Sequence, residues 1–447
     1  MKIMFKSIKK VVLVVLLIST NCFAQQLDFE KLDAFFEVLE TNNKLMATMT
    51  ITKNETEVYK KSVGFSDVTL KTKHSENTKF RIGSITKTFT AVIIFQLIDE
   101  GKLSLETKLS KYFPRIANAS NITIANLLNH SSGLFNITNS DDAGSWIYET
   151  SSQNDMLSRI EKFETNFSPG EKMEYSNTNY MLLGYIAETI DKKLYKHILE
   201  DRIIKKINLK NTYYGSEINA NNNESSSYAI QNGEWSLQLE TNMSNPGGAG
   251  AIVSTSKDLT IFMNALFNNK LISKDSFEIM KTHPNDDDTC HGIFYANMNG
   301  LDIYASEGGI DGFQSMLVHI PATKTTIALT GNALDFSKMR IMLSAFAVSH
   351  GQPIEIPKFG KIEITEAIAK QYEGEYACDK VPYKLIFKAN GNILMGAPEQ
   401  SNLKELTPTK QHQFTFDTLG IVLDFYPEAG SVRFTQPDKE PLVFEKL

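Results

Sequence analysis

Cysteine is scarce in this chain of 447 residues, and the usual patterns of metal and phosphate sites are missing. Only Cys22, Cys290 and Cys378 occur, and the eight histidines show no metal-ligand spacing. There is no C-x-x-C or H-E-x-x-H, and the glycine-rich stretch 246–250 lacks the Gly-Lys-Ser/Thr ending of a phosphate loop. We therefore expect no metal, no cofactor and no disulfide framework.

Long apolar runs are also rare, and the run at 11–18 is too short to remain as a membrane span. It follows four lysines and precedes Cys22-Phe23-Ala24, which is the arrangement of a secretory signal peptide cleaved after Ala24. A lipid anchor on Cys22 is the second interpretation, because Ser19-Thr20-Asn21 differs from the bacterial lipoprotein signal. We expect an exported protein, periplasmic or secreted.

A basic excess is absent as well. The formal charge is −6, and without residues 1–24 the chain keeps 42 basic and 52 acidic residues, a charge of −10. A nucleic-acid partner is therefore not expected. The length predicts two domains, and the apolar fraction of 42% is ordinary for a globular protein with a sizeable core. The sequence does not indicate an oligomeric state.

A serine and a lysine three residues apart open an apolar segment. Ser84 and Lys87 precede residues 89–98, which are apolar on nearly every side and predict a buried helix that stops at Gly101. Positions i and i+3 share one face of a helix. Burial lowers the pKa of a lysine, which can then help a serine lose its proton. Taken alone, the pair more often represents an N-cap serine and a surface lysine.

Two further clusters supply candidate site residues. Tyr175 and Asn177 are two positions apart and can face one cleft, where a tyrosine with a lowered pKa could act as a base and the amide could orient a substrate carbonyl. The glycine-rich segment 306–313 precedes a predicted strand at 316–320, and its free N–H groups could form half of an oxyanion hole. Each cluster alone also fits a purely structural role.

His130 lies next to Ser131 and Ser132, which suggests a Ser-His pair. No G-x-S-x-G elbow surrounds either serine, and no acid follows at a telling spacing. We interpret His130 as a hydrogen-bonded structural histidine at the end of a short helix at 122–129.

In this order, the three clusters resemble the serine β-lactamase and penicillin-binding-protein superfamily. They are most similar to the branch of class C β-lactamases, D-alanyl-D-alanine carboxypeptidases and related esterases. The resemblance covers residues 29–350 and includes the flanking segments 80–83, 127–134, 169–170 and 247–259. It implies an α/β (α+β) fold, in which helices and a helical subdomain flank an antiparallel sheet.

The resemblance also implies roles for the candidate residues. Ser84 would be the acylated nucleophile, Lys87 would share its proton, and Tyr175 would be the acid/base partner. Asn177 would hold the substrate amide, and the N–H groups of Ser84 and Gly309 would form the oxyanion hole.

One motif departs from the family pattern. Where the family usually has Lys-Thr-Gly or His-x-Gly, this chain has Ser306, Glu307 and Gly308. We expect Ser306, Gly308 and Gly309 to bind substrate, with a serine hydrogen bond in place of a cation. A charged hydrogen bond is worth about 1.5–3 kcal/mol against about 1 for a neutral one, on the order of tenfold in binding a free carboxylate. Substrates that lack a carboxylate would lose less.

The predicted organisation is a signal peptide at 1–24, a β-lactamase-like serine hydrolase domain at 25–350, a linker at 351–360 and a C-terminal domain at 361–447. Early elements are a helix at 29–42 and strands at 46–52 and 57–64. A helix at 366–371 and strands at 383–388, 393–395, 413–416, 421–426, 431–435 and 442–445, with a hairpin at Asn390-Gly391, resemble a lipocalin-like antiparallel β-barrel.

These patterns together predict an exported serine hydrolase that cleaves an amide or ester. The first expectation is a D-alanyl-D-alanine carboxypeptidase, D-peptidase or β-lactamase-like activity on a peptidoglycan-type D-peptide or a β-lactam. The alternatives are an esterase or D-amino-acid amidase, and a non-catalytic binding or regulatory protein on the same scaffold.

Overall fold

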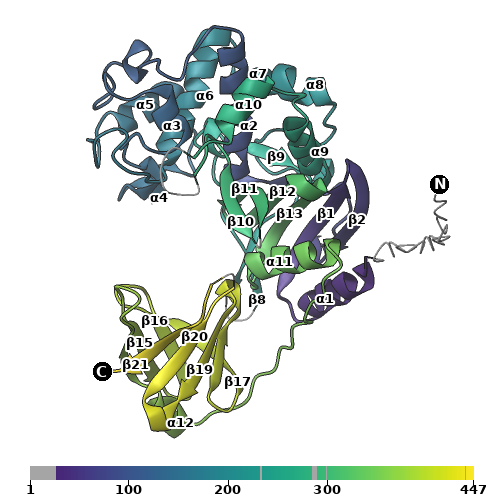
Figure 1. Cartoon of the computed structure of the whole chain (residues 1–447), viewed down its shortest axis with the longest axis vertical. Helices are drawn as coiled ribbons and strands as arrows, with labels where there is room; N and C mark the ends of the chain where they lie inside the picture. Colours follow the sequence, from purple (N-terminus) through teal and green to yellow (C-terminus); the bar gives the residue numbers. More distant parts are fainter. Residues whose placement is uncertain (1–26, 232–233, 284–288, 299, 438) are drawn as a thin grey trace, which may run out of the picture.

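The computed structural model describes residues 27–231, 234–283, 289–298, 300–437 and 439–447. The predicted signal peptide lies outside these residues. Among the helices of the described ranges, none combines the length and apolar character needed to cross a membrane. Most of the chain forms a part with helices around a large antiparallel sheet, and the C-terminal end forms a β-barrel (Figure 1). The α+β fold class is therefore confirmed.

The large sheet joins the beginning of the chain to strands from residue 294 onward. Its order is β10-β11-β12-β13-β1-β2, and all neighbours are antiparallel. The strands predicted at 46–52 and 57–64 are confirmed as β1 and β2, and the strand at 316–320 belongs to β12. The bounds are β1 (Leu45–Lys53), β2 (Thr56–Val63), β10 (Phe294–Met298), β11 (Leu301–Ile310), β12 (Phe313–Ile320) and β13 (Thr325–Leu334).

Helices cover both faces of this sheet. α1 (Phe29–Thr41) and α11 (Lys338–Ser349) pack on one face, where Met49 and Ile51 of β1 join their apolar cluster. α9 (Ser256–Phe267) packs on the other face, where Thr50 Oγ1 lies 2.8 Å from Ser256 Oγ. The alternation of threonine and apolar residues along β1 therefore does not mark a solvent-exposed face, because the threonines are buried against a helix.

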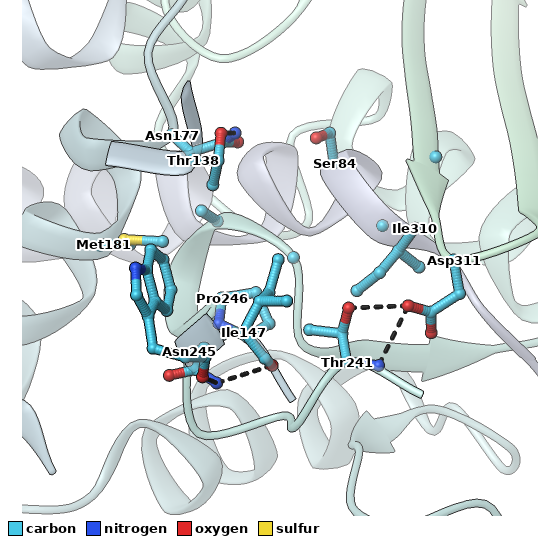
Figure 2. A pocket seen from close by; sticks show the side chains of 15 residues that line it. Ser84, Thr138, Ile147, Asn177, Met181, Thr241, Asn245, Pro246, Ile310 and Asp311 are labelled. Atoms are coloured by element: carbon cyan, nitrogen blue, oxygen red, sulfur yellow. Dashed lines mark hydrogen bonds between the residues drawn. The ribbon is translucent and has the colours of Figure 1, made fainter. Parts of the chain in front are cut away.

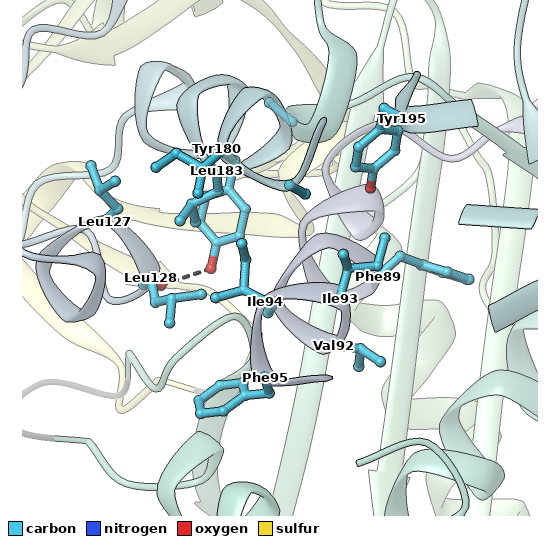
Figure 3. Packing of buried hydrophobic residues seen from close by; sticks show 14 of the residues in the cluster. Phe89, Val92, Ile93, Ile94, Phe95, Leu127, Leu128, Tyr180, Leu183 and Tyr195 are labelled. Atoms are coloured by element: carbon cyan, nitrogen blue, oxygen red, sulfur yellow. Dashed lines mark hydrogen bonds between the residues drawn. The ribbon is translucent and has the colours of Figure 1, made fainter. Parts of the chain in front are cut away.

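The second core surrounds α2 (Thr86–Asp99), which follows a 3-10 turn, η1 (Gly83–Ile85). Its residues are buried from Thr86 to Leu97, and the helix ends at Asp99, two residues before Gly101, whose φ is +68°. Phe89 stacks on Phe262 of α9 with ring centroids 3.6 Å apart. Tyr180 of α6 (Asn177–Asp191) donates a 2.7 Å hydrogen bond to the Leu128 carbonyl (Figure 3). The prediction of a helix buried on all sides is confirmed.

The remaining helices contribute to the apolar cluster around α2, and the short strands form three small sheets of their own. The helices are α3 (Ile124–Leu128), α4 (Ala143–Trp146), α5 (Gln153–Ile160), α6 (Asn177–Asp191), α7 (Tyr195–Leu199), α8 (Lys205–Ile207) and α10 (Lys274–Met280). The short strands are β3 (Phe65–Asp67), β4 (Thr72–Lys73), β5 (Phe80–Arg81), β6 (Tyr213–Tyr214), β7 (Tyr228–Gln231), β8 (Glu234–Leu237) and β9 (Ile252–Ser254).

The C-terminal strands close into a barrel in chain order, as the sequence predicts. Aromatic side chains such as Tyr376, Phe387 and Phe425 fill its interior. The hairpin signal at Asn390-Gly391 is confirmed, with a two-residue loop at 391–392. The elements are α12 (Glu366–Gln371), β14 (Gly374–Ala377), β15 (Leu385–Asn390), β16 (Ile393–Pro398), β17 (Lys404–Lys410), β18 (Gln413–Phe416), β19 (Ile421–Tyr426), β20 (Ser431–Thr435) and β21 (Leu442–Lys446).

Residues 351–360 contain no helix or strand. Their side chains Ile354, Ile356 and Phe359 pack against the cluster beneath α1 and α11, so this connection is held to the sheet part. The barrel contacts the same part through Lys44, whose Nζ lies 2.7 Å from Asp335 Oδ2 and 3.2 Å from Asp417 Oδ2.

Candidate active site

Ser84 lies in the η1 turn at the start of α2, where the turn touches strand β11. Gly83 has a φ of +52°, and a Cβ there would lie 2.8 Å from the backbone nitrogen and oxygen of Gly309. A Cβ on Gly308 would lie 1.9 Å from the Ile82 carbonyl oxygen. Glycine at these positions lets the two backbones approach, which brings Ser84 beside the strand edge.

Lys87 lies one turn further along α2 and is buried. Its Nζ is 2.8 Å from Ser84 Oγ, from Asn177 Oδ1 and from the Ala249 carbonyl oxygen. Burial lowers the pKa of Lys87 well below its ordinary value of 10.5. The amide and carbonyl oxygens can only accept, so they take the two hydrogens of the neutral amine. Its lone pair is then left for the Ser84 hydroxyl proton.

Tyr175 completes the contacts of Ser84. Its Oη lies 2.7 Å from Ser84 Oγ and 3.4 Å from Asn177 Oδ1. Burial raises the pKa of Tyr175 to about 12, although the hydrogen bond to Ser84 works in the opposite direction. The prediction of a lowered tyrosine pKa is therefore wrong. The physical reason is burial, which disfavours the charged phenolate. Tyr175 faces Ser84 as a phenol that can donate a proton.

The ring of His130 packs against the ring of Tyr175. The two ring centroids are 4.5 Å apart, and His130 Nδ1 accepts a 3.2 Å hydrogen bond from the Ser176 backbone N–H. Burial lowers the pKa of His130 to about 3. The neighbouring serines bond to asparagines, Ser131 to Asn129 at 2.6 Å and Ser132 to Asn179 at 2.7 Å. His130 is hydrogen-bonded just beyond the end of the helix at 124–128, as predicted, and it also borders the slot beside Ser84 and Tyr175.

Two cavities meet at Ser84. The larger, about 240 Å³, is bordered by Asn177 and Gly309 (Figure 2). Its apolar lining includes Trp146, Ile147, Met181, Pro246 and Ile310. The smaller, about 20 Å³, is bordered by Tyr175 and Glu307. A substrate with its reacting carbon at Ser84 would therefore have a roomier apolar space on the Asn177 side and a narrow slot on the Tyr175 side.

The third motif lies on β11, where side chains alternate between two faces. Ser306 and Gly308 face the interior, whereas Glu307 and Gly309 are exposed. Ser306 lines the narrow slot and accepts a 2.9 Å hydrogen bond from Thr88 Oγ1. The structure thus brings Ser306 and Gly309 to Ser84. Gly308 was also expected to bind substrate, but it is packed against the η1 turn and is not open to a substrate.

Other contributors to the site come from segments to which the sequence assigns no chemistry. Ala249, in the glycine-rich turn, supplies a carbonyl to Lys87, and a Cβ on the preceding Gly248 would lie 2.8 Å from the Tyr180 carbonyl oxygen. Such paired glycines signal close backbone approach. Asp311 forms a buried 2.9 Å ion pair with Arg81 and accepts two hydrogen bonds from Thr241, which fixes the turn after Gly309 (Figure 2). A single aspartate after glycines carries no such signal.

Across the ranges that the structure describes, no three His, Cys, Asp or Glu side chains gather as ligands for a metal ion. The two cysteines of these ranges are thiols, Cys290 buried and Cys378 half-buried.

Known proteins are similar to this chain in sequence and in fold. Protein flp from Staphylococcus aureus (strain MW2) is 29% identical over 299 residues, which cover 64% of this chain and 59% of that protein. The chain therefore matches less than two thirds of that relative. Penicillin-binding protein 4* from Bacillus subtilis (strain 168) is 26% identical over 427 residues, 88% of this chain and 93% of that protein.

The octameric penicillin-binding protein homologue from Pyrococcus abyssi has the same fold, with a TM-score of 0.66 at 22% identity, over 94% of this chain and all of that one. The model of the family described as Beta-lactamase matches residues 33–350. The match covers most of the chain and includes Ser84, Lys87, Tyr175 and Asn177. This chain belongs to the beta-lactamase family.

Proposed function

We propose that the protein is an exported serine hydrolase that cleaves an amide or ester through an acyl-Ser84 intermediate. The observation that carries the proposal is the position of Lys87, a buried amine 2.8 Å from the Ser84 hydroxyl whose other two partners are the neutral oxygens of Asn177 and Ala249. An uncompensated buried charge is costly, so this environment favours the neutral amine. A neutral amine is a base, and this one is aimed at a hydroxyl.

Acylation uses these contacts in sequence. Ser84 Oγ attacks the substrate carbonyl carbon while its proton passes to Lys87 Nζ, and the carbonyl π electrons move to the oxygen. The backbone N–H groups of Ser84 and Gly309 are the proposed donors to this oxyanion. When the tetrahedral intermediate collapses, Tyr175 donates its phenolic proton to the leaving nitrogen or oxygen. The Lys87 ammonium then returns a proton to Tyr175, which restores both groups.

Deacylation runs the same relay with water in place of the leaving group. Water attacks the acyl carbon, one of its protons passes through Tyr175 toward Lys87, and Ser84 leaves with a proton. Asn177 positions Lys87 in this relay, because its Oδ1 accepts a hydrogen bond from Lys87 Nζ. Its Nδ2 donates to Thr138 Oγ1 at 3.0 Å, which fixes the amide. Its amide also borders the larger cavity, where it can bond to the acyl part of a substrate.

The substrates we propose are amides or esters. Peptidoglycan-type D-peptides and β-lactams come first because of the family and the predicted export. Esters and D-amino-acid amides are favoured by one observation, the presence of Ser306 and Glu307 where a cation would bind a free carboxylate. A non-catalytic binding protein is the alternative, and it would leave the buried, neutral Lys87 without a role.

The domain organisation that we propose follows the predicted boundaries. Residues 25–350 would form the hydrolase domain, 351–360 the linker and 361–447 the barrel domain. The core of the barrel, from Ile364 to Phe444, is distinct from the two clusters of the hydrolase part.

A substrate panel tests the proposal. The mature protein should hydrolyse at least one of a D-alanyl-D-alanine peptide, a D-amino-acid amide and a neutral aryl ester, and Ser84→Ala should abolish that activity. Ser104→Ala, at an exposed serine that bonds to Thr107, is the matched control and should retain it. Equal rates in wild type and Ser84→Ala would contradict the proposed nucleophile.

A further inference from the structure

Glu307 borders two spaces. It lines the narrow slot together with Ser84 and Tyr175, and it also lines a groove of about 450 Å³. The groove runs between the large sheet and the barrel, because Met316 and Lys338 line it on one side and Leu419 and Pro437 on the other. The glutamate therefore lies between the slot beside the nucleophile and the larger groove, and borders both.

The slot is the leaving-group side of the site if the proposed mechanism holds. A proton donor must come within hydrogen-bond reach of the atom that it protonates. Tyr175 is the proposed donor, and it lines the slot, whereas Asn177 and Gly309 line the opposite cavity. A leaving group protonated by Tyr175 therefore extends past Glu307 toward the groove.

Of the charged residues that line the groove, Glu307 is the one that also borders the slot, so a leaving group meets its negative charge first. Lys338 Nζ lies 2.6 Å from Glu307 Oε1, but the lysine side chain is 12% exposed and the glutamate side chain 57%. Lys338 is also held by Gln314 Oε1 at 3.1 Å and by the Ser315 carbonyl at 3.4 Å. The carboxylate thus covers the ammonium. Lys439 is the other charged group that lines the groove, and it comes from the barrel wall.

We propose that Glu307 determines the charge preference of the leaving group. It selects amines or alcohols that carry a cationic substituent, such as an ammonium group, and disfavours those that end in a free carboxylate. The cationic substituent lies against Glu307 at the entrance of the groove. This inference rests on the proposed hydrolase function and adds to it the chemical class of the leaving group.

The test uses three esters with one acyl group and leaving phenols that differ in charge but hardly in reactivity. Their para substituents are aminomethyl, methyl and carboxymethyl. The expected order of kcat/KM is ammonium, then neutral, then carboxylate, with about tenfold between the extremes at low salt for a half-exposed charge. The ratio should shrink as salt is raised, because the charge is reached from solvent.

Two variants of the same ion pair should act in opposite directions. Glu307→Gln should reduce the ammonium-to-carboxylate ratio to below about threefold, and Lys338→Gln should increase it, since the carboxylate loses its partner. Glu405→Gln is the matched control, because Glu405 is 53% exposed and pairs with Lys361 at 3.7 Å on the barrel. It should leave the ratio unchanged.

The outcomes separate this inference from the proposed function. If neither the neutral ester nor any substrate of the panel above is hydrolysed in a Ser84-dependent way, the proposed function fails and the inference with it. If the neutral ester is hydrolysed but the wild type shows a ratio near one or prefers the carboxylate, only the inference is overturned. It is also overturned if Glu307→Gln slows all three esters equally, which would mark a structural role.

Discussion

At the scale of single residues, the protonation of Lys87 decides whether Ser84 can react. We predict that the rate of labelling by a neutral fluorophosphonate rises with pH, with a midpoint below 10.5, because a lower pH adds a proton to Lys87 and removes the base. No fall is expected below about pH 10, because the pKa of Tyr175 is raised to about 12.

His130 provides the control for this pH profile. Its pKa is lowered to about 3, so it stays neutral through the measured range. His130→Gln should keep the midpoint of the wild type. A midpoint near 6.5 that disappears in His130→Gln would show that histidine, and not Lys87, is the titrating base.

Lys87→Met separates the role of the amine from that of the side-chain volume. We expect labelling to slow by about a thousandfold, within the usual range for removal of a general base. The melting temperature should be maintained or raised, because an apolar side chain of similar length replaces a buried amine. Rapid labelling in this variant would mean that another group accepts the Ser84 proton.

At the scale of elements, the contact between β11 and the η1 turn sets the geometry of the site. Gly308→Ala would place a Cβ 1.9 Å from the Ile82 carbonyl oxygen, so the strand must move away. We expect a loss of about 1–3 kcal/mol in the free energy of unfolding, with a loss of activity. Denaturant unfolding measures the first and ester hydrolysis the second.

The neighbouring glycine is the matched control for stability. A Cβ on Gly309 would have Gln314 Nε2 as its nearest neighbour, at 3.5 Å, which is an ordinary contact. Gly309→Ala should change the free energy of unfolding by no more than about 0.5 kcal/mol. Equal destabilisation by both substitutions would mean that the β11 contact with η1 is not the reason.

The local pattern of apolar and turn residues predicts several C-terminal elements correctly. The helix at 366–371 and the strands at 413–416, 421–426 and 431–435 are found with these bounds. β17 was not predicted, because Pro408 and the charged residues around it weaken the pattern. In the structure the register of β17 with β18 shifts between Pro408 and Lys410.

The candidate site was predictable only in part, because local spacing places neighbours along one element but not contacts between distant segments. The spacing of Ser84 with Lys87 and of Tyr175 with Asn177 places each pair on one side of a single element. The direction of the Tyr175 pKa and the carbonyl of Ala249 depend on packing between distant segments, which local spacing does not carry.

At the scale of the whole molecule, Lys44 ties the barrel to the sheet. Burial opposes its charge, but Asp335 and Asp417 raise the pKa of Lys44 above 10.5. A raised lysine pKa stabilises the fold below pH 10.5 and ceases to do so as the pH rises through the folded value. We expect Lys44→Met to lower the free energy of unfolding by about 1 kcal/mol at pH 7. The difference should shrink above pH 10.5.

Lys361→Met is the control for this prediction. Lys361 and Glu405 are both largely exposed, and their charges lie 3.7 Å apart on the barrel. Exposed pairs contribute little, so a change below about 0.5 kcal/mol is expected. If Lys44→Met is equally mild in thermal unfolding, the ion pairs of Lys44 do not hold the barrel in place.

The central claim is that Ser84 is an activated nucleophile, and covalent labelling tests it most directly. The mature protein and Ser84→Ala are incubated with a fluorophosphonate and with a labelled penicillin, and intact mass is measured. The account predicts a fluorophosphonate adduct on the wild type that is absent from Ser84→Ala, with weaker labelling by the penicillin, whose free carboxylate meets Ser306 and Glu307. No adduct from either reagent on folded wild-type protein would contradict the account.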